Sequence, residues 1–305
     1  MLLCVVFPVI TAPVALLMGL LVAFVMGHPF LHLNKKATTL LLQISVVCLG
    51  FHMNFELALK ASKASFLFTV GTIGITLLAG WFIGKRLKID NKTSMLISNG
   101  TAICGGSAIA AIAPIIKAND HQISVSLGTI FILNSIALFI FPPLGHMLGF
   151  NDQQFGTWCA IAIHDTSSVV GAASKFSDKA LQVATTIKLE RALWIIPLSL
   201  ITSYFQKNTG KIKIPYFIFY FVIAILISTY LPVYLPVLNN KLGDNTPFDW
   251  LFLLGKKGLV ITLFLIGSGL SLNTIKQVGF RPVLQGVLLW VLIGTLSLFV
   301  IKEML

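Results

Sequence analysis

The sequence predicts an all-α polytopic membrane protein, and two properties of the chain carry this prediction. Hydrophobic residues make up 56% of the 305 residues and charged residues only 10%, with a mean hydropathy of +0.92. A water-soluble protein of this length could not hide so much apolar surface. The apolar residues also lie in continuous runs of about 20, the length of a membrane-crossing helix, whereas β-barrel strands would alternate over about 10 residues.

About ten such runs follow one another. They are residues 3–27, 39–58, 64–84, 94–116, 122–149, 157–174, 184–205, 214–236, 251–272 and 282–302. The connections are too short for a soluble domain, so we expect a single transmembrane transporter domain over residues 1–305. The first run has no basic region before it, and Pro8 and Pro13 divide it. Residues 1–8 therefore read as the tail of a helix whose beginning is missing, and the N-terminus does not have the pattern of a signal peptide.

The net charge of +12 does not point to nucleic acid, because most cations lie between the apolar runs. There they report orientation in the lipid bilayer. The four cysteines, Cys4, Cys48, Cys104 and Cys159, all fall within runs and lack the spacing of metal ligands. We expect no disulfide framework, no metal and no cofactor.

The first candidate site is a polar, glycine-rich segment at 99–111, inside the fourth run. Adjacent glycines cost about 1 kcal/mol each in a helix interior, so Gly105 and Gly106 predict a break with the helix resuming at Ser107. The new helix N-terminus would offer free N–H groups to an anion, with Thr101 and Cys104 nearby. The alternative is that the glycines only permit a close helix crossing.

A second polar segment, 162–173, lies in the sixth run. Lipid offers no partner to polar groups, so such sequence is expected to line a cavity or pack against protein. His164 and Asp165 are candidates for proton coupling, and Thr166, Ser167 and Ser168 are candidates for substrate contact. The structural alternatives are a helix-to-helix hydrogen bond for the histidine and tight packing for the three hydroxyls.

A third group of charges lies in the seventh run. Glu190 is deep in apolar sequence, between Lys188 and Arg191, although a charge at the bilayer centre costs at least about 2.5–3.5 kcal/mol. Either the group is a structural ion pair, or Arg191 or Lys188 attracts an anion while Glu190 or Asp165 takes and releases a proton. Neighbouring residues on a helix point in different directions, so Glu190 and Arg191 are not expected to pair with each other.

Faint internal repetition accompanies these segments. Ala102-Ile-Cys-Gly-Gly-Ser107 is similar to Ala162-Ile-His-Asp-Thr-Ser167 in register. Inverted repeats with broken helices are the usual plan of secondary transporters, although chance similarity among small apolar residues is a competing explanation.

Four blocks resemble the YeiH family (UPF0324) of bacterial inner-membrane proteins, for which sulfate export has been suggested. The most specific is Ser98-Asn-Gly-Thr-Ala-Ile-Cys-Gly-Gly-Ser107 with its continuation to Ala118; the others are 49–55, 163–173 and 188–197. The resemblance covers nearly the whole chain. It implies a fold similar to that of bile acid symporters and sodium/proton antiporters, with a core bundle of broken helices and a panel. It also places an acid at Asp165 and a basic residue at Arg191, but no fixed acid at Glu190.

The resulting hypothesis is a secondary active transporter, not an enzyme, in the bacterial inner membrane. It would export a small inorganic or organosulfur oxyanion such as sulfate by alternating access. The coupling ion would be a proton or sodium, and a homodimer is a candidate assembly. Arg191 would supply charge to the anion. The alternatives are a cation- or organic-acid-coupled carrier of another substrate, an anion channel, or a membrane hydrolase using Ser167 or Cys104 with His164. For the hydrolase, neither a Gly-x-Ser-x-Gly nor a His-Glu-x-x-His pattern appears.

Overall fold

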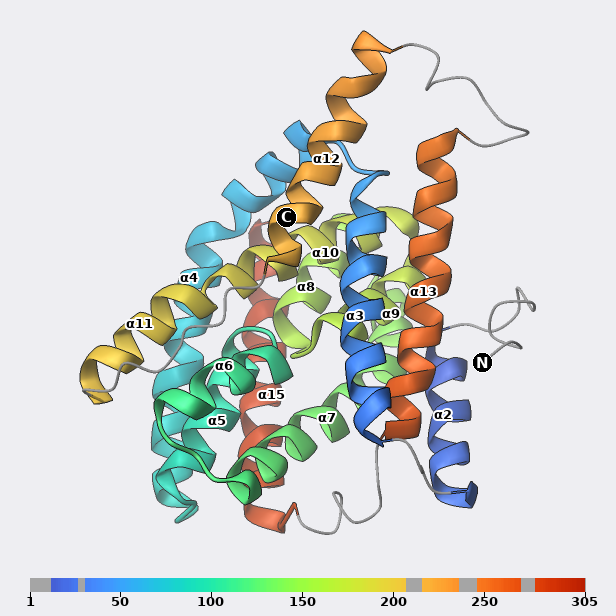
Figure 1. Ribbon diagram of the computed structural model, residues 1–305. Coiled ribbons are helices and arrows are strands. Elements are labelled where there is room, and N and C mark those ends of the chain that lie inside the picture. The colour runs from blue at the N-terminus through green and yellow to red at the C-terminus, as the bar shows by residue number, and fades with distance from the viewer. Residues whose placement is uncertain (1–11, 27–30, 207–215, 236–245, 270–277, 305) are drawn as a thin grey trace. The chain divides into compact units, whose positions relative to one another are not determined.

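The computed structural model describes residues 12–26, 31–206, 216–235, 246–269 and 278–304, and these residues form helices without any strand (Figure 1). The helices are α2 (Ala12–Met26), α3 (Leu31–Gly50), α4 (Phe55–Arg86), α5 (Asn91–Ala102), α6 (Gly106–Ile115), α7 (Asp120–Met147), α8 (Asp152–Ala162), α9 (Thr166–Phe176), α10 (Asp178–Leu193), α11 (Ile195–Gln206), α12 (Phe217–Tyr234), α13 (Pro247–Gly269) and α15 (Phe280–Met304). The predicted all-helical class is confirmed for these residues.

Among the described residues, five helices are long and apolar enough to cross a membrane. They comprise Phe66–Arg86 of α4, all of α7, α12 and α13, and Phe280–Glu303 of α15. Each of the ten expected runs overlaps at least one helix, but three of them are divided into two shorter helices: α5 with α6, α8 with α9, and α10 with α11. The expected start of the chain in mid-helix lies outside the described residues.

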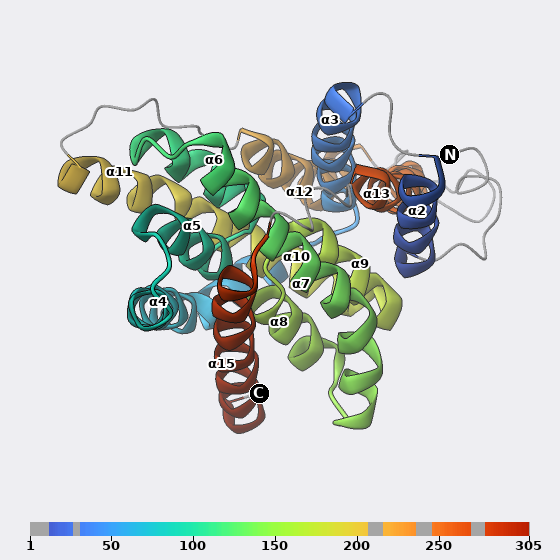
Figure 2. The same ribbon diagram turned by 90° about the horizontal axis from the view of Figure 1, so that it is seen from below.

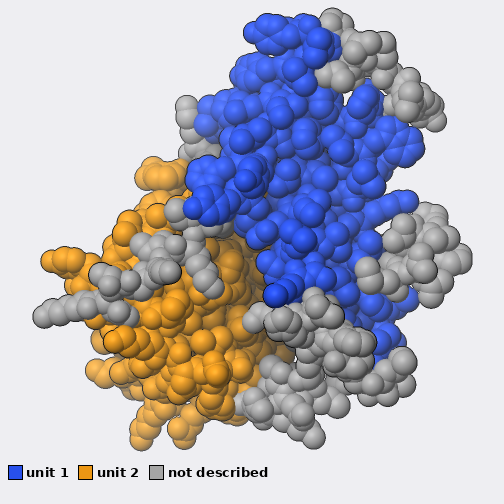
Figure 3. Space-filling view, viewed as in Figure 1, with its two compact units in different colours: residues 1–63, 215–271 blue, residues 64–214, 272–305 orange. Residues whose placement is uncertain are grey.

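The chain divides into two compact units, residues 1–63 with 215–271 and residues 64–214 with 272–305 (Figure 3). In the first unit, α13 packs along both α2 and α3, and α12 packs on α3. The packing is close because glycines lie at the contacts. A Cβ on Gly19 would come within 2.1 Å of the Phe264 carbonyl, and one on Gly267 within 2.3 Å of the Leu16 carbonyl. Small residues at helix contacts are typical of membrane bundles.

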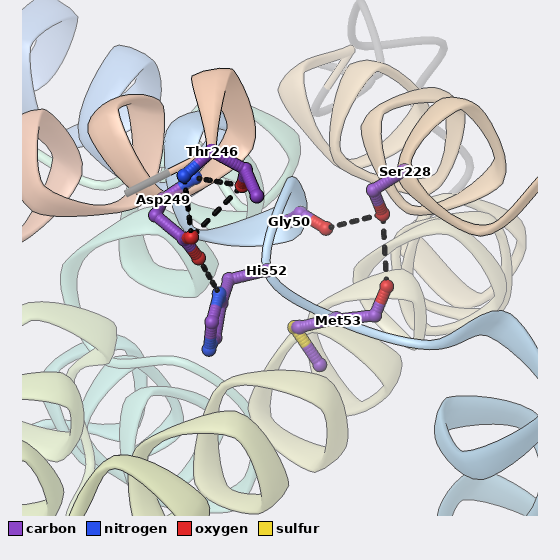
Figure 4. Close-up of polar contacts among 6 residues, drawn as sticks. All are labelled: Gly50, His52, Met53, Ser228, Thr246 and Asp249. Atoms are coloured by element: carbon purple, nitrogen blue, oxygen red, sulfur yellow. Dashed lines mark hydrogen bonds and ion pairs between the residues drawn. The ribbon is translucent and has the colours of Figure 1, made fainter. Parts of the chain in front are cut away.

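The end of α3 is fixed by polar contacts within the same unit (Figure 4). Ser228 donates its hydroxyl to the Met53 carbonyl at 2.9 Å. His52 lies 3.0 Å from a carboxylate oxygen of Asp249 and stacks on the Phe252 ring. Asp249 also accepts from the backbone N–H and hydroxyl of Thr246. The polar residues that follow α3 therefore stabilise the end of this helix.

The second unit contains all the broken helices. α10 packs on α8 and α9, α7 packs on α5 and α9, and α15 packs on α5, α7 and α8; Figure 2 shows α15 beside α8. A cluster of buried apolar side chains, including Leu96, Ile109 and Ile130, joins α5, α6 and α7. Gln285 of α15 donates to the hydroxyls of Ser94 and Ser98 on α5. The unit therefore holds the divided helices against the continuous helices α7 and α15.

Candidate functional site

The first interruption lies between α5 and α6, where the glycine pair predicted it. Gly105 is the N-cap of α6, with φ +63° and ψ −122°, a conformation that is essentially restricted to glycine. Its N–H donates to the Gly100 carbonyl at 2.8 Å, which closes the turn. The helix resumes at Gly106, one residue before the predicted Ser107. The predicted break is confirmed.

A second interruption separates α8 from α9, inside the run 157–174, at a position where no break was specifically predicted. α8 ends at Ala162, and Ile163 and Asp165 have extended backbones. Asp165 is the N-cap of α9 and accepts from the Ser167 backbone N–H at 3.1 Å, as well as from the Ser167 hydroxyl. An aspartate N-cap is a strong local signal for starting a helix, which explains the break without any glycine.

The two interruptions meet. A Cβ placed on Gly105 would lie 3.2 Å from the Asp165 Cβ and 3.3 Å from the His164 carbonyl oxygen. Asn134 of α7 ties the second break in place, because its side-chain oxygen accepts from the backbone N–H of His164 at 3.1 Å and of Asp165 at 3.3 Å. The two polar segments of the sequence therefore form one site, which we call the crossing: residues 103–105 and 163–165 with the helix ends beside them.

Two cations of α10 bind the helix ends that terminate at the crossing. The Lys188 ammonium donates to the carbonyls of Ala160 at 3.3 Å and Ile163 at 2.8 Å, at the end of α8. Arg191 donates one guanidinium nitrogen to the Thr72 hydroxyl at 2.8 Å and the other to the Ala102 carbonyl, at the end of α5. Both side chains are fully buried, at 0% exposure. Helix C-termini carry partial negative charge, so each contact is favourable.

Several buried polar atoms at the crossing have no hydrogen-bond partner among the described residues. They are both ring nitrogens of His164, Thr101 Oγ1, Asn99 Oδ1 and Asn134 Nδ2. Buried polar groups are nearly always bonded, and exceptions often mark sites that act on water, ions or ligands. The group therefore favours a working site over inert packing.

The remaining predicted residues have distinct surroundings. Ser107 is exposed and Gly106 half-buried; the Cys104 thiol lies 2.8 Å from the Ser107 hydroxyl. Thr166 and Ser168 are buried in the first turn of α9. Glu190 is half-buried on α10, on a different face from Lys188 because two residues turn a helix by about 200°.

The hydroxyl and thiol candidates for nucleophilic catalysis do not bond to the histidine in the described structure. Ser167 donates to Asp165, Cys104 pairs with Ser107, and the His164 ring nitrogens have no partner. A hydrolase would place its base within hydrogen-bond reach of its nucleophile, so the geometry gives no support to that alternative.

The sequence pointed to Lys188 only as an alternative to Arg191 for attracting an anion, and it did not single out Asn134 or Thr72. Lys188 and Arg191 are three residues apart and so share a helix face, which could have linked them. Asn134 is a buried amide in the apolar middle of α7, and Thr72 is one of three buried threonines of α4, with Thr69 and Thr76, at helical spacing. Polar residues spaced along one face of a membrane helix were the available signal.

Comparison with known proteins agrees with the resemblance noted in the sequence. A family model described as conserved hypothetical protein 698 matches residues 5–286. The UPF0324 membrane protein of Bacteroides thetaiotaomicron is 53% identical over 293 residues, covering 95% of this chain and 86% of the relative. Its counterpart in Porphyromonas gingivalis is 50% identical with the same coverage. No solved structure matches the chain. The chain belongs to the UPF0324 family of multi-pass membrane proteins.

Proposed function

We propose that this protein is a secondary active transporter that exports a small oxyanion, with sulfate as the first candidate, by alternating access. The observation that carries the proposal is the crossing of two interrupted helices with unpaired buried polar groups around it. Irregular backbone at membrane depth is tolerated where it lines a cavity or is buried in protein. Broken helices that meet in this way are typical of carriers.

An anion suits the N-terminus of α6 better than that of α9. Gly105 provides no side-chain cap, so the first N–H groups of α6 have no carboxylate bound to them, and Ser107 is exposed beside them. The N-terminus of α9, in contrast, is already capped by Asp165. Free N–H groups and the positive end of a helix attract anions. We therefore place the oxyanion at α6, with Cys104, Ser107 and Thr101 as further contacts.

Asp165 provides a reason for coupling to protons. Its Cβ lies close to Gly105, and a negative carboxylate there would repel an anion bound at α6. Protonation of Asp165 would remove this repulsion, so anion occupancy and proton occupancy would favour each other. His164, buried and without a ring partner, is the second candidate for carrying the proton. We do not assign Glu190 a direct part in carrying the proton.

The wider features of the proposal follow from the resemblance. We propose about ten membrane spans, a core-and-panel fold similar to that of bile acid symporters, and location in the bacterial inner membrane, with a homodimer as one possible assembly. Both interrupted helices belong to the unit of residues 64–214 and 272–305. That unit is therefore the part that we propose moves during transport.

The test is sulfate counterflow in liposomes containing the purified protein, with the external pH held fixed and a proton gradient present or absent. We expect saturable exchange that depends on the gradient. Asp165→Asn keeps the oxygen that caps α9 but cannot carry a proton, so its exchange should no longer respond to the gradient. Folded protein that exchanges neither sulfate, sulfite nor small sulfonates would refute the oxyanion assignment. Currents without saturation would indicate a channel.

A further inference from the structure

The two buried cations lie at helix ends where related architectures hold a metal cation. In secondary transporters with broken helices, carbonyls of the unwound segments and of half-helix C-termini coordinate sodium. Here the carbonyls of Ala160 and Ile163 accept from Lys188, and the carbonyl of Ala102 accepts from Arg191. Both C-terminal helix ends at the crossing are therefore already bound to positive charge.

These contacts are fixed by the fold. Lys188 and Arg191 are one turn apart on α10, which packs on α8, and both are fully buried. Thr72, the other partner of Arg191, lies six residues into the span that begins at Phe66, roughly 9 Å along the helix axis. A cation at that depth is costly unless it is paired. The side chains cannot leave for an exposed position without moving α10.

We infer that Lys188 and Arg191 are resident cations of the crossing, occupying the positions in which sodium would otherwise bind. They are positioning residues that hold the ends of α8 and α5 and do not contact the transported anion. Transport consequently requires no sodium, which leaves the proton as the coupling ion. The part concerning transport kinetics rests on the proposed function, whereas the part concerning sodium binding stands without it.

The first experiment measures sodium binding to the purified wild-type protein with radioactive sodium at equilibrium. A parallel measurement compares its melting temperature in sodium chloride and in choline chloride at equal ionic strength. We expect no saturable sodium binding and equal melting temperatures. Saturable binding with a sodium-dependent melting temperature would overturn the inference. Neither measurement depends on the substrate. A failure to exchange sulfate would therefore refute the proposed function without affecting the conclusion about sodium binding.

The second experiment removes a resident cation. Lys188→Ala frees the carbonyls of Ala160 and Ile163 and opens space, whereas Lys188→Met removes the charge and keeps most of the volume. We expect Lys188→Ala to gain saturable sodium binding and a melting temperature that rises with sodium but not with choline. Lys188→Met should show neither effect. A folded Lys188→Ala protein that binds no sodium would count against the inference, and if the variant does not fold, the wild-type measurement decides.

Arg191 allows a chemical rescue, because its side-chain cation exists as a free ion. Guanidinium at low millimolar concentration, far below denaturing levels, should raise the melting temperature of Arg191→Ala but not of the wild type. Where exchange is measurable, either Ala variant should lower the maximal rate by about tenfold or more and change KM for sulfate by less than about twofold. Sodium should restore the rate of Lys188→Ala, and guanidinium should restore the rate of Arg191→Ala. A KM increase of about tenfold with the rate unchanged would make the residue an anion ligand and refute the positioning role.

Discussion

Replacing Gly105 by alanine tests whether the crossing depends on the backbone at this residue. Gly105 has φ +63° and ψ −122°, and an alanine held in such a conformation is strained by about 1–3 kcal/mol. The added Cβ would also lie 3.2 Å from the Asp165 Cβ and 3.3 Å from its Cα, closer than ordinary contact. Relief would require the two interruptions to move apart.

The expected result is a lower melting temperature. At about 2 °C for each kcal/mol in a protein of this size, Gly105→Ala should lower it by about 2–6 °C. The assay is thermal unfolding of the detergent-purified protein, followed by the fluorescence of a thiol-reactive dye. If the proposed function holds, sulfate exchange should fall as well, because the N-terminus of α6 moves with the turn.

Gly106→Ala is the matched control. Its Cβ would meet Leu127 at 3.4 Å and Phe131 at 3.6 Å, which are ordinary contacts, and alanine favours the helix by up to about 1 kcal/mol over glycine. This variant should melt at or slightly above the wild-type temperature. If Gly105→Ala is as stable as the wild type, or if both variants lose equally, the argument from the turn geometry is wrong.

Three further changes test contacts within the units by the same thermal assay. Thr72→Val removes an acceptor from the buried Arg191 and should cost about 1–3 kcal/mol, whereas Thr72→Ser keeps the hydroxyl and should cost less; equal losses would argue against this bond. Asn134→Leu leaves two backbone N–H groups without their acceptor, so it should destabilise by about 1–3 kcal/mol or more and speed amide hydrogen exchange at residues 164 and 165; unchanged exchange there would contradict the role. Gly267→Ala places a Cβ 2.3 Å from a carbonyl of α2 and should destabilise the protein, whereas Gly71→Ala meets nothing within 4 Å and should not.

Local sequence was sufficient where the structural cause is local. Gly105 and Gly106 predicted the first break because glycine is the residue that tolerates the turn, whatever surrounds it. The second break, between α8 and α9, was not predicted. The polar residues there indicated a cavity or packing site, although Asp165 followed by Thr166 and Ser167 is also a signal for the start of a helix. That signal was present in the sequence, inside a continuous apolar run.

The roles of the charged residues could not be predicted in the same way. Arg191 bonds to Ala102, 89 residues away, and to Thr72, 119 residues away. The sequence showed that these charges need partners at membrane depth, but it favoured carboxylates or a substrate anion. It did not point to backbone carbonyls at the ends of interrupted helices as partners of these side chains, because their availability depends on a break elsewhere in the chain.

The sequence by itself determined the membrane class, the helical fold, the family and the place of the first break. Each depends on composition or on neighbouring residues, which act wherever the segment lies. Only the tertiary structure decided that the two breaks meet at Gly105 and Asp165, and that α10 supplies the cations for both helix ends. These features depend on which helices pack together. In a bilayer, close packing and hydrogen bonds between helices decide this, and apolar helix surfaces resemble one another too much to specify partners from sequence alone.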